Sequence, residues 1–118
     1  MAARAIQRWV RQSPRKMRLV VDQIRGSDVN AAYAVLKYSK KRAAKQIEKV
    51  LRSAVANAEQ HALRADAALD VDRLVVTHAV VDEGPTFKRF RAAALGRGAP
   101  IKKRTSHVEI RVTDHGGA

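Results

Sequence analysis

Two segments with the composition of β-strands are joined by residues 84–107, GPTFKRFRAAALGRGAPIKKRTSH. The stretch contains seven Lys or Arg residues and no Asp or Glu. The segment before it, residues 71–83, is rich in β-branched side chains, which favours a strand with a buried face. The segment at its end, residues 101–113, finishes in an alternation of apolar and polar side chains, the period of a strand with one solvated face. The two segments are therefore predicted to be antiparallel neighbours joined by a basic hairpin.

The connection between these strands, residues 84–100, is long for a hairpin, since such loops normally have about two to five residues. If both strands continue outward as a ribbon, about eight residues per arm carry its tip roughly 25 Å beyond the body. Gly84 and Pro85 at the base, with Gly96 and Gly98 past the middle, permit bends there. A two-stranded ribbon with so little apolar content is only marginally stable in water. The ribbon is therefore expected to lie against a partner.

A strand and a helix are predicted at the start of the chain. Residues 4–11 (RAIQRWVR) mix β-forming side chains with Arg at short spacing, which suggests a strand. In the following SPRKMRLVVDQIRG, Ser13 suits a helix N-cap and Pro14 the first helical position. Apolar residues then recur at helical spacing until Gly26, which supplies a left-handed stop. A helix is therefore expected over residues 14–25.

Two further helices and a polar connection complete the pattern. One helix begins after a cap at Ser27 or Asp28 and ends near Tyr38, and the longest covers residues 41–63 with one apolar face. Residues 64–70 are polar and form a connection. The predicted fold class is α+β, with three helices packed on a small antiparallel three-stranded sheet and a long protruding β-hairpin.

Length and composition favour one domain over residues 1–118. Its globular body is expected at about 1–83 and 101–113, its extended hairpin at about 84–100, and a flexible tail at 114–118. The apolar runs are far shorter than the roughly 20 residues of a membrane span, and no apolar leader precedes the first helix. We therefore expect a protein that enters no membrane and stays in the compartment where it is made.

The charge of the chain is large and sorted along the sequence. The chain has 24 Lys and Arg against 11 Asp and Glu, which gives a net charge of +13 and a pI near 11.1. Residues 1–21, 29–47 and 84–108 hold 18 of the 24 cations, whereas residues 48–83 hold seven of the 11 acids. Charge that served only solubility would mix the two signs. Segregated cations at this pI are typical of a nucleic-acid-binding surface.

The residue types that catalyse reactions or bind metals are poorly arranged for either role. The chain has no Cys, and its four His residues show no spacing typical of a metal site. Ser106 and His107 are neighbours on a predicted strand and so point to opposite faces, and the same holds for Asp82 and Glu83. The GRG of residues 96–98 lacks the Lys-Ser/Thr of a phosphate-binding loop. We therefore expect no catalytic residue, no metal ligand, no cofactor and no small-molecule substrate.

Other features fit RNA. Arg15, Lys16 and Arg18 lie in the first turn of the first predicted helix, where the helix dipole disfavours positive charge. A phosphate at that end would be held by free backbone N–H groups and side chains together. In the hairpin, Phe87 and Phe90 lie among Lys and Arg, a combination that stacks on unpaired bases and neutralises the RNA backbone. A small apolar plug at the hairpin base is the alternative reading of both Phe residues.

The longest predicted helix carries a basic stripe opposite its apolar face. Lys41, Lys45, Lys49 and Arg52 follow one another at steps of three or four residues. A solvated helix face explains such a stripe as well as a bound phosphate backbone does, so the stripe alone does not decide between them.

Four stretches, SPRKMRLVVDQIRG, VLRSAVANAEQH, VVDEGPTFKRF and IKKRTSHVEIRV, resemble the bacterial large-subunit ribosomal protein twenty-two family in order and spacing. The resemblance covers about Ala3 to Val112. It implies a cytoplasmic structural constituent of the large ribosomal subunit whose body binds and organises several domains of large-subunit rRNA. It also implies a hairpin that reaches the wall of the nascent-peptide exit tunnel, with neighbouring ribosomal proteins and the nascent polypeptide as further partners. An enclosed cationic hairpin would have anionic RNA on every side.

Site residues are expected from the matching positions and from the cation blocks. The residues expected to bind rRNA are Arg4, Arg8, Arg11, Ser13, Arg15, Lys16, Arg18, Lys41, Lys45, Lys88, Arg89, Arg91, Arg97, Lys102, Lys103, Arg104, Thr105, Ser106 and His107. Those expected at the hairpin tip are Phe90, Arg91, Ala92, Ala93, Ala94, Leu95 and Gly96. Members of the family usually have Pro-Arg in the region of residues 92–95, so this chain lacks one tip cation and has Leu95 where a polar residue is usual.

Two other classes of protein share parts of this pattern. An architectural binder of double-stranded nucleic acid would insert the hairpin into a groove, and would bind duplex DNA about as well as rRNA. An RNA-modifying enzyme would need a pocket with a cofactor, which nothing in the sequence requires.

Overall fold

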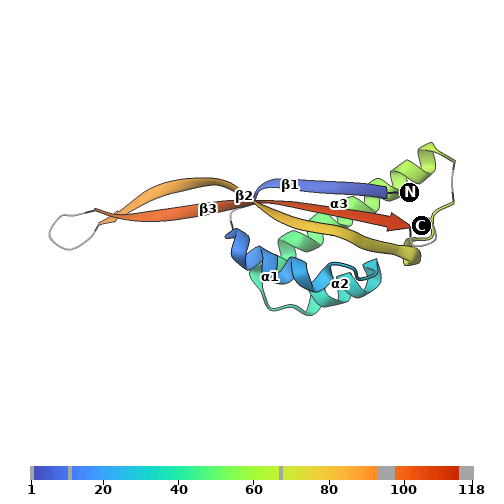
Figure 1. Cartoon of the computed structure of the whole chain (residues 1–118), viewed down its shortest axis with the longest axis horizontal. Coiled ribbons are helices and arrows are strands. Elements are labelled where there is room, and N and C mark those ends of the chain that lie inside the picture. Colours follow the sequence, from blue (N-terminus) through green and yellow to red (C-terminus); the bar gives the residue numbers. More distant parts are fainter. Residues whose placement is uncertain (1, 11, 67, 93–97, 115–118) are drawn as a thin grey trace.

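The computed structural model describes residues 2–10, 12–66, 68–92 and 98–114, and the elements below are those of these residues. In chain order they are β1 (Ala2–Val10), α1 (Pro14–Ile24), α2 (Val29–Tyr38), α3 (Arg42–Arg64), the 3-10 helix η1 (Val71–Arg73), β2 (Leu74–Ala92) and β3 (Gly98–Asp114). The strands form one antiparallel sheet in the order β1-β3-β2, so that β3 is central (Figure 1). The predicted α+β class and the three-stranded antiparallel sheet are confirmed.

The helix ends follow the signals in the sequence. Pro14 opens α1 after Ser13, although the Ser13 hydroxyl makes no capping hydrogen bond. After the C-cap, Gly26 has a φ of +83°, the left-handed conformation that stops a helix. The Asp28 carboxylate caps α2 by accepting a hydrogen bond from the Ala31 N–H at 3.3 Å. The predicted helix bounds are therefore right to within one or two residues.

Two strand boundaries differ from the prediction. Residues 71–73 form a 3-10 turn instead of the start of a strand, because the Asp70 carboxylate accepts a hydrogen bond from the Asp72 N–H at 3.0 Å. The following Leu74 begins β2. At the other end of the chain, β1 begins at Ala2 and not at residue 4, since Ala2 still pairs with Thr113 of β3.

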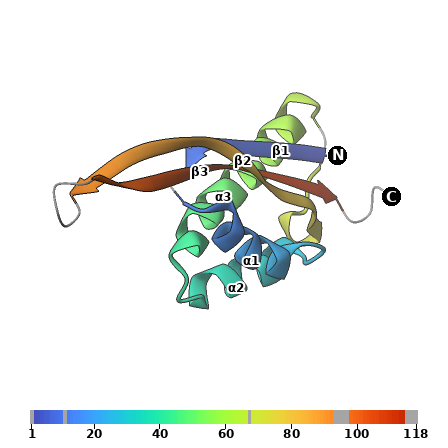
Figure 2. The same ribbon diagram turned by 60° about the vertical axis from the view of Figure 1, so that its left-hand side comes forward.

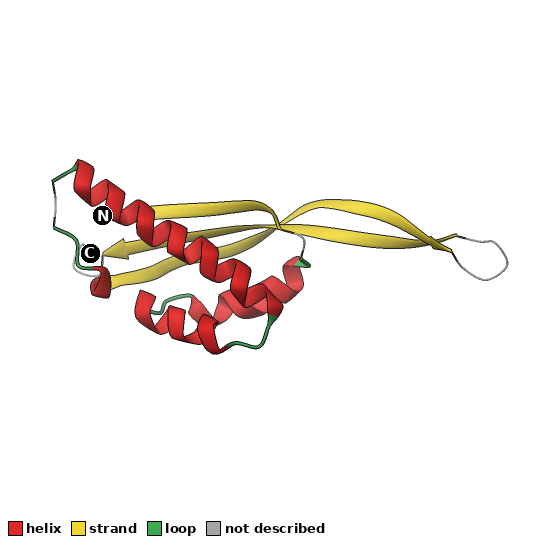
Figure 3. Ribbon diagram, turned by 180° about the vertical axis from the view of Figure 1, so that it is seen from behind, coloured by secondary structure: helices red, strands yellow, loops and turns green. Residues whose placement is uncertain are grey.

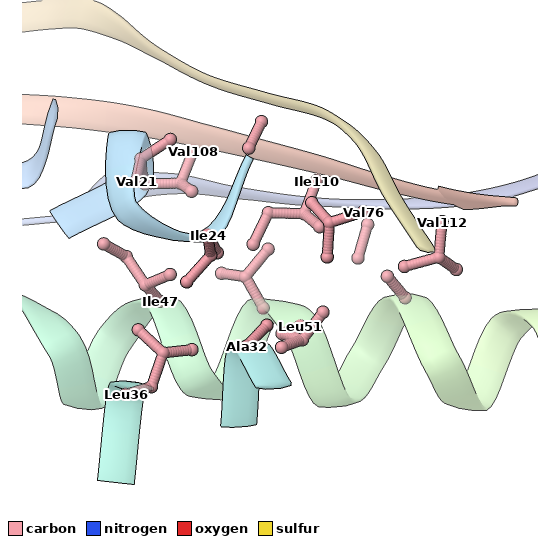
Figure 4. Close-up of a cluster of buried hydrophobic side chains, with 14 of the residues drawn as sticks. Val21, Ile24, Ala32, Leu36, Ile47, Leu51, Val76, Val108, Ile110 and Val112 are labelled. Atoms are coloured by element: carbon pink, nitrogen blue, oxygen red, sulfur yellow. The ribbon is translucent and has the colours of Figure 1, made fainter. Parts of the chain in front are cut away.

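The helices cover one face of the sheet and leave the other open (Figures 2 and 3). Helix α3 packs against β1 and β3, and α1 packs against β2. Figure 4 shows side chains of the sheet, such as Val76 and Ile110, pointing towards Ile47 and Leu51 of α3. The largest fully buried side chains are Met17, Ile24, Ile47, Leu51, Leu74, Ile110, Val20, Val21, Val29, Val76, Val108 and Val112. Their burial supplies the main stabilisation of the fold.

A bulge in β2 changes which of its residues face the helices. Val76 pairs with Val112, but His78 pairs with Arg111, so Thr77 is an extra residue on this strand. Before the bulge the even-numbered Val76 is buried, and after it the odd-numbered Ala79 is buried. One inserted residue therefore keeps an apolar row against α1 along the whole body of the strand.

Backbone hydrogen bonds fix the end of α1 to this strand. The Gly26 N–H donates to the Val76 carbonyl at 2.8 Å, and the Val76 N–H donates to the Ser27 carbonyl at 2.9 Å. The residues that stop α1 therefore pair with the edge strand β2, which determines how the helix lies along the sheet.

Strand β1 has its own irregularity near its end. Gln7 pairs with Val108 and Val10 with Ser106, so Arg8 and Trp9 together face one residue of β3. Trp9 has a φ of +62°, which is rare for a bulky side chain. Such a backbone costs roughly 1–2 kcal/mol for a residue with a Cβ atom.

The hairpin strands stay paired beyond the body. A second bulge places Gly84 and Pro85 against Thr105, and pairing then continues from Thr86–Arg104 to Ala92–Gly98. In Figure 1 this outer ribbon is drawn past the helices. Residues 93–97 lie outside the described residues, as do 115–118 of the predicted tail. How far the hairpin protrudes, and the division into body, hairpin and tail, therefore stay predictions.

Candidate nucleic-acid interface

A basic hollow of the described surface lies where the end of β1 meets the start of α3. Its volume is about 520 Å³. The described residues that line it include four cations and no acid, and they are Val10, Gln12, Ser39, Lys40, Lys41, Arg42, Lys45 and Gln46. We call this the α3 hollow. Because its charge is not neutralised by its own lining, it suits an anionic ligand the size of one or two phosphates.

The backbone at the start of α3 adds to this character. Lys41 occupies the N-cap position without a side-chain capping bond, and the first turn contains no acidic residue. The N–H groups of a helix start carry a partial positive charge. Lys41 and Lys45 are both exposed. The fold therefore brings Lys41 and Lys45 together at the start of α3, where the backbone N–H groups and the side chains all carry positive charge.

The first turn of α1 divides the predicted cations into two kinds. Arg15 and Lys16 are exposed, so their charges are open to a ligand. Arg18 instead donates two hydrogen bonds to the Val81 carbonyl, from Nε at 3.1 Å and Nη2 at 2.9 Å. Its guanidinium therefore ties α1 to β2 although the residue is exposed, and its predicted contact with RNA stays a prediction.

Arg25 has a similar structural role, which the sequence analysis did not anticipate. Its Nε and Nη2 donate to the Ala79 carbonyl at 3.1 and 2.6 Å, and its Nη1 donates to Asp22 at 2.8 Å. Arg18 and Arg25 are seven residues apart, which places them two turns apart on the same side of α1. This spacing could have predicted that both side chains reach the same neighbouring strand.

The KRTSH run at residues 103–107 also contains both exposed and buried residues. Arg104 is exposed. Thr105 and Ser106 are 1% and 0% exposed, and the Ser106 hydroxyl donates to the Gln12 carbonyl at 2.6 Å. The Ser106 hydrogen bond fixes the chain just after β1 to β3. Both side chains are buried in this structure, and their predicted contact with rRNA stays a prediction.

His107 is half-buried and is occupied by β1. Its Nδ1 accepts a hydrogen bond from the backbone N–H of Trp9 at 3.2 Å, and the two rings meet edge to face with centroids 5.4 Å apart. His107 therefore stabilises the bulge of β1, as a structural histidine would.

For the cations of the hairpin, the structure describes the backbone positions and not the side chains. Lys88, Arg89 and Arg91 belong to β2, and Lys102 and Lys103 to β3, where Lys88 pairs with Lys102. Like-charged residues directly opposite one another repel, which a surrounding polyanion would relieve. Their side chains lie outside the description, as does all of Arg97.

The tip prediction can be followed only to the last pairs of the ribbon. Phe90, Arg91 and Ala92 pair with Pro100, Ala99 and Gly98. The remaining tip residues, Ala93, Ala94, Leu95 and Gly96, lie outside the described residues, so their predicted place stays a prediction.

On β1, the predicted cations differ in their neighbours. Arg8 is exposed on the open face of the sheet. Arg4 is also exposed, but its Nη1 lies 3.7 Å from the Glu109 carboxylate. Arg11 lies outside the described residues. Ser13, the remaining predicted residue of this region, is half-buried at the start of α1.

The stripe along α3 changes character from one end to the other. Lys41 and Lys45 line the α3 hollow, whereas Arg52 pairs with Glu48 at 2.6 Å on the same helix. Lys49, between them, lines a smaller hollow of about 240 Å³ beside β1. The first two turns of α3 are therefore the part of the stripe whose charge suits a polyanion.

Two groups have pKa values shifted from their ordinary range, for different reasons. A hydrogen bond from Arg111, at 2.9 Å, lowers the pKa of Glu109, with nearby cations acting in the same direction. Burial raises the pKa of the Tyr33 hydroxyl. Glu109 is thus held as a carboxylate within a basic surface and neutralises part of the charge of β1 and β3.

Within the described ranges, no group of three or more His, Asp or Glu side chains is placed to hold a metal ion. Of the helices in this part of the chain, none has the length and apolarity needed to cross a bilayer.

Sequence reasoning missed two members of the α3 hollow and the exposure of Trp9. Lys40 and Arg42 line the α3 hollow, and their place beside a predicted helix start was a usable signal. Trp9 was read only as a strand former, because the bulge that turns it outward leaves no mark in the strand pattern.

Fold and surface together define a basic α+β protein whose uncompensated cations suit an anionic polymer. A family model described as Ribosomal protein L22p/L17e matches residues 5–113, so the chain belongs to the L22p/L17e family of ribosomal proteins. The resemblance seen in the sequence is confirmed. This family is structural, not enzymatic, and its members are cytoplasmic components of the large ribosomal subunit.

Proposed function

We propose that this chain binds large-subunit rRNA through several separate basic surfaces and holds domains of that RNA together. The observation that carries the proposal is the α3 hollow, where four cations and a helix start converge without an acid in the lining. Arg15 and Lys16 at the start of α1, and Arg104 at the base of the ribbon, present further exposed charge. Surfaces on different elements allow one protein to neutralise phosphates of several RNA segments.

The hairpin extends this function. Paired strands with cations directly opposite each other, as at Lys88 and Lys102, are expected to lie within folded RNA. By the family resemblance, the tip residues around Ala93 line the nascent-peptide exit tunnel and meet the nascent polypeptide. The protein would act by charge neutralisation and shape matching, without catalysis.

Co-sedimentation and competition test the proposal. The full chain should sediment with large ribosomal subunits, and unlabelled large-subunit rRNA should displace a labelled rRNA fragment far better than duplex DNA of equal mass does. Equal competition by duplex DNA would favour the architectural binder of double-stranded nucleic acid.

A matched pair of variants locates the contact on α3. Replacing Lys41 and Lys45 by Met should weaken rRNA binding and reduce the salt slope by about two, one for each lost phosphate contact. Arg52→Met on the same helix removes a cation that Glu48 already neutralises, and should change the slope little. The same loss from both variants would contradict a specific role for the α3 hollow.

A further inference from the structure

The open face of the sheet carries an apolar patch that the proposed function does not use. Trp9 and Ile6 are 58% and 42% exposed. They line a hollow of about 260 Å³, and the full lining is Ile6, Arg8, Trp9, Asp82, His107, Val108 and Glu109. We call it the Trp9 hollow. An exposed aromatic, an aliphatic side chain and an Arg around one depression form a surface that differs from the α3 hollow, whose lining has four cations and no aromatic.

A strained backbone is what places the Trp9 ring on this face. In β1 the odd-numbered Ala3 and Ala5 are buried, so an unbroken strand would turn Trp9 inward and Val10 outward. The bulge reverses this: Val10 is 5% exposed, and Trp9 lies outward with a φ of +62°. Glycine would adopt this backbone without strain. A large aromatic kept at such a position points to a use for its ring.

The ring is also fixed in place by its neighbour. The backbone N–H of Trp9 donates a hydrogen bond to Nδ1 of His107 at 3.2 Å, and the imidazole stands at 89° to the indole with centroids 5.4 Å apart. A ring held by both its backbone and an edge-to-face contact loses little conformational freedom when a ligand stacks on it.

The charges of the hollow favour a base over a phosphate. Asp82 and Glu109 are part of the lining, and two carboxylates would repel a phosphate. A nucleotide base is neutral, and its amino groups can donate hydrogen bonds to carboxylates. Arg8 beside the indole offers the combination of aromatic and guanidinium on which unpaired bases stack.

We propose that the Trp9 hollow is a stacking site for one unpaired nucleotide base of RNA. This inference rests on the proposed RNA-binding function and specifies the element that the open sheet face meets: a bulged or single-stranded nucleotide, not a paired helix.

Trp9 is the only tryptophan of the chain, so intrinsic fluorescence reports on this site. The full chain is titrated at low salt with a short unstructured oligoadenylate, with a fully paired RNA duplex of the same length, and with inorganic polyphosphate. Stacking predicts strong quenching by the oligoadenylate and little by the other two. Quenching by polyphosphate to the same extent would show that charge alone is sensed, and would overturn the proposal.

Variants separate stacking from folding. Trp9→Ala should weaken oligoadenylate binding by about five- to 150-fold, whereas Trp9→Tyr should retain most of the affinity. Trp9→Gly should lose the same affinity yet be at least as stable to urea as Trp9→Ala, because glycine relieves the positive φ. Tyr38→Ala is the matched control, since Tyr38 is an exposed aromatic (79%) outside the Trp9 hollow, and it should leave binding unchanged.

The outcomes distinguish the two proposals. A parent chain that binds rRNA, with a folded Trp9→Ala variant that binds oligoadenylate equally well, would overturn the stacking site and leave this face to a protein neighbour. A parent chain that binds neither RNA would overturn the proposed function and the stacking site with it.

Discussion

Replacing Gly84 by alanine tests how closely the two strands pack at the base of the ribbon. A Cβ atom at residue 84 would lie 2.5 Å from Oγ1 of Thr105 and 3.3 Å from Cε1 and Nε2 of His107. Real Cβ atoms essentially never come within 3.0 Å of another heavy atom. Thr105 is 1% exposed, so its hydroxyl has no solvent to move into. Such overpacking typically lowers the free energy of unfolding by about 1–3 kcal/mol, and we expect Gly84→Ala to fall in this range.

Urea unfolding, followed by circular dichroism, measures this loss, and a double-mutant cycle assigns it. Thr105→Ala removes the clashing hydroxyl, so Gly84→Ala should cost at least about 0.5 kcal/mol less in that background than in the parent. Thr105→Val keeps both γ branches and should give no such relief. Gly26→Ala is the control without a clash, because no heavy atom lies within 4 Å of an added Cβ at residue 26. Only the strain of its φ of +83° should lower the free energy of unfolding, by about 1–2 kcal/mol.

Two results would refute this reasoning. One is a Gly84→Ala variant whose free energy of unfolding lies within about 0.5 kcal/mol of the parent's, a difference typical of an unconstrained surface site. The other is an equal cost of Gly84→Ala in the parent and in Thr105→Ala.

Three further predictions concern stability and local opening. Arg18→Met should lower the free energy of unfolding by about 1 kcal/mol in urea titrations, because the Val81 carbonyl loses two hydrogen bonds, and an unchanged midpoint would contradict the tie between α1 and β2. The pKa of Glu109 is lowered in the folded state, so its carboxylate stabilises the fold above its ordinary pKa, and this contribution is lost as the pH falls through the folded pKa. Glu109→Gln should therefore destabilise by about 0.2–1 kcal/mol at pH 7, and the difference should shrink as the pH is lowered below the ordinary pKa of a Glu side chain. A difference independent of pH would argue against the ion pair with Arg111. In hydrogen exchange on the free protein, amides of residues 86–92 should exchange faster than those of 74–81, which pack against α1, and equal protection would show that the ribbon needs no partner.

The sequence predicted the helices because their signals are local. Ser13, Pro14 and Gly26 mark the ends of α1 without reference to the rest of the fold. The bulges at Thr77 and Trp9 could not be predicted in this way, since they arise from matching one strand to another. Once a bulge shifts the alternation, residues such as Val10 and Trp9 exchange faces, and a period of two read from the sequence assigns them wrongly.

The candidate site was predicted as a set of charges, and the structure adds which charges are already used. Lys41 and Lys45 line one hollow, as members of one predicted cation block, whereas Arg18 bonds within the protein because a carbonyl of β2 lies beside α1. Ser106 lies on the same side of β3 as Val108, so its burial follows from strand alternation and could have been predicted. Thr105 breaks that alternation because it lies opposite the bulge at Gly84. Its burial therefore could not have been predicted from the sequence pattern.

The salt dependence of binding to large-subunit rRNA measures whether this chain neutralises rRNA phosphates at several places at once. Each phosphate engaged adds to the slope of log affinity against log salt concentration. Contacts from α1, the α3 hollow and the ribbon together predict a slope steeper than about −3, equivalent to at least about four phosphates. A shallower slope for the full chain would contradict a protein that neutralises rRNA at several places at once.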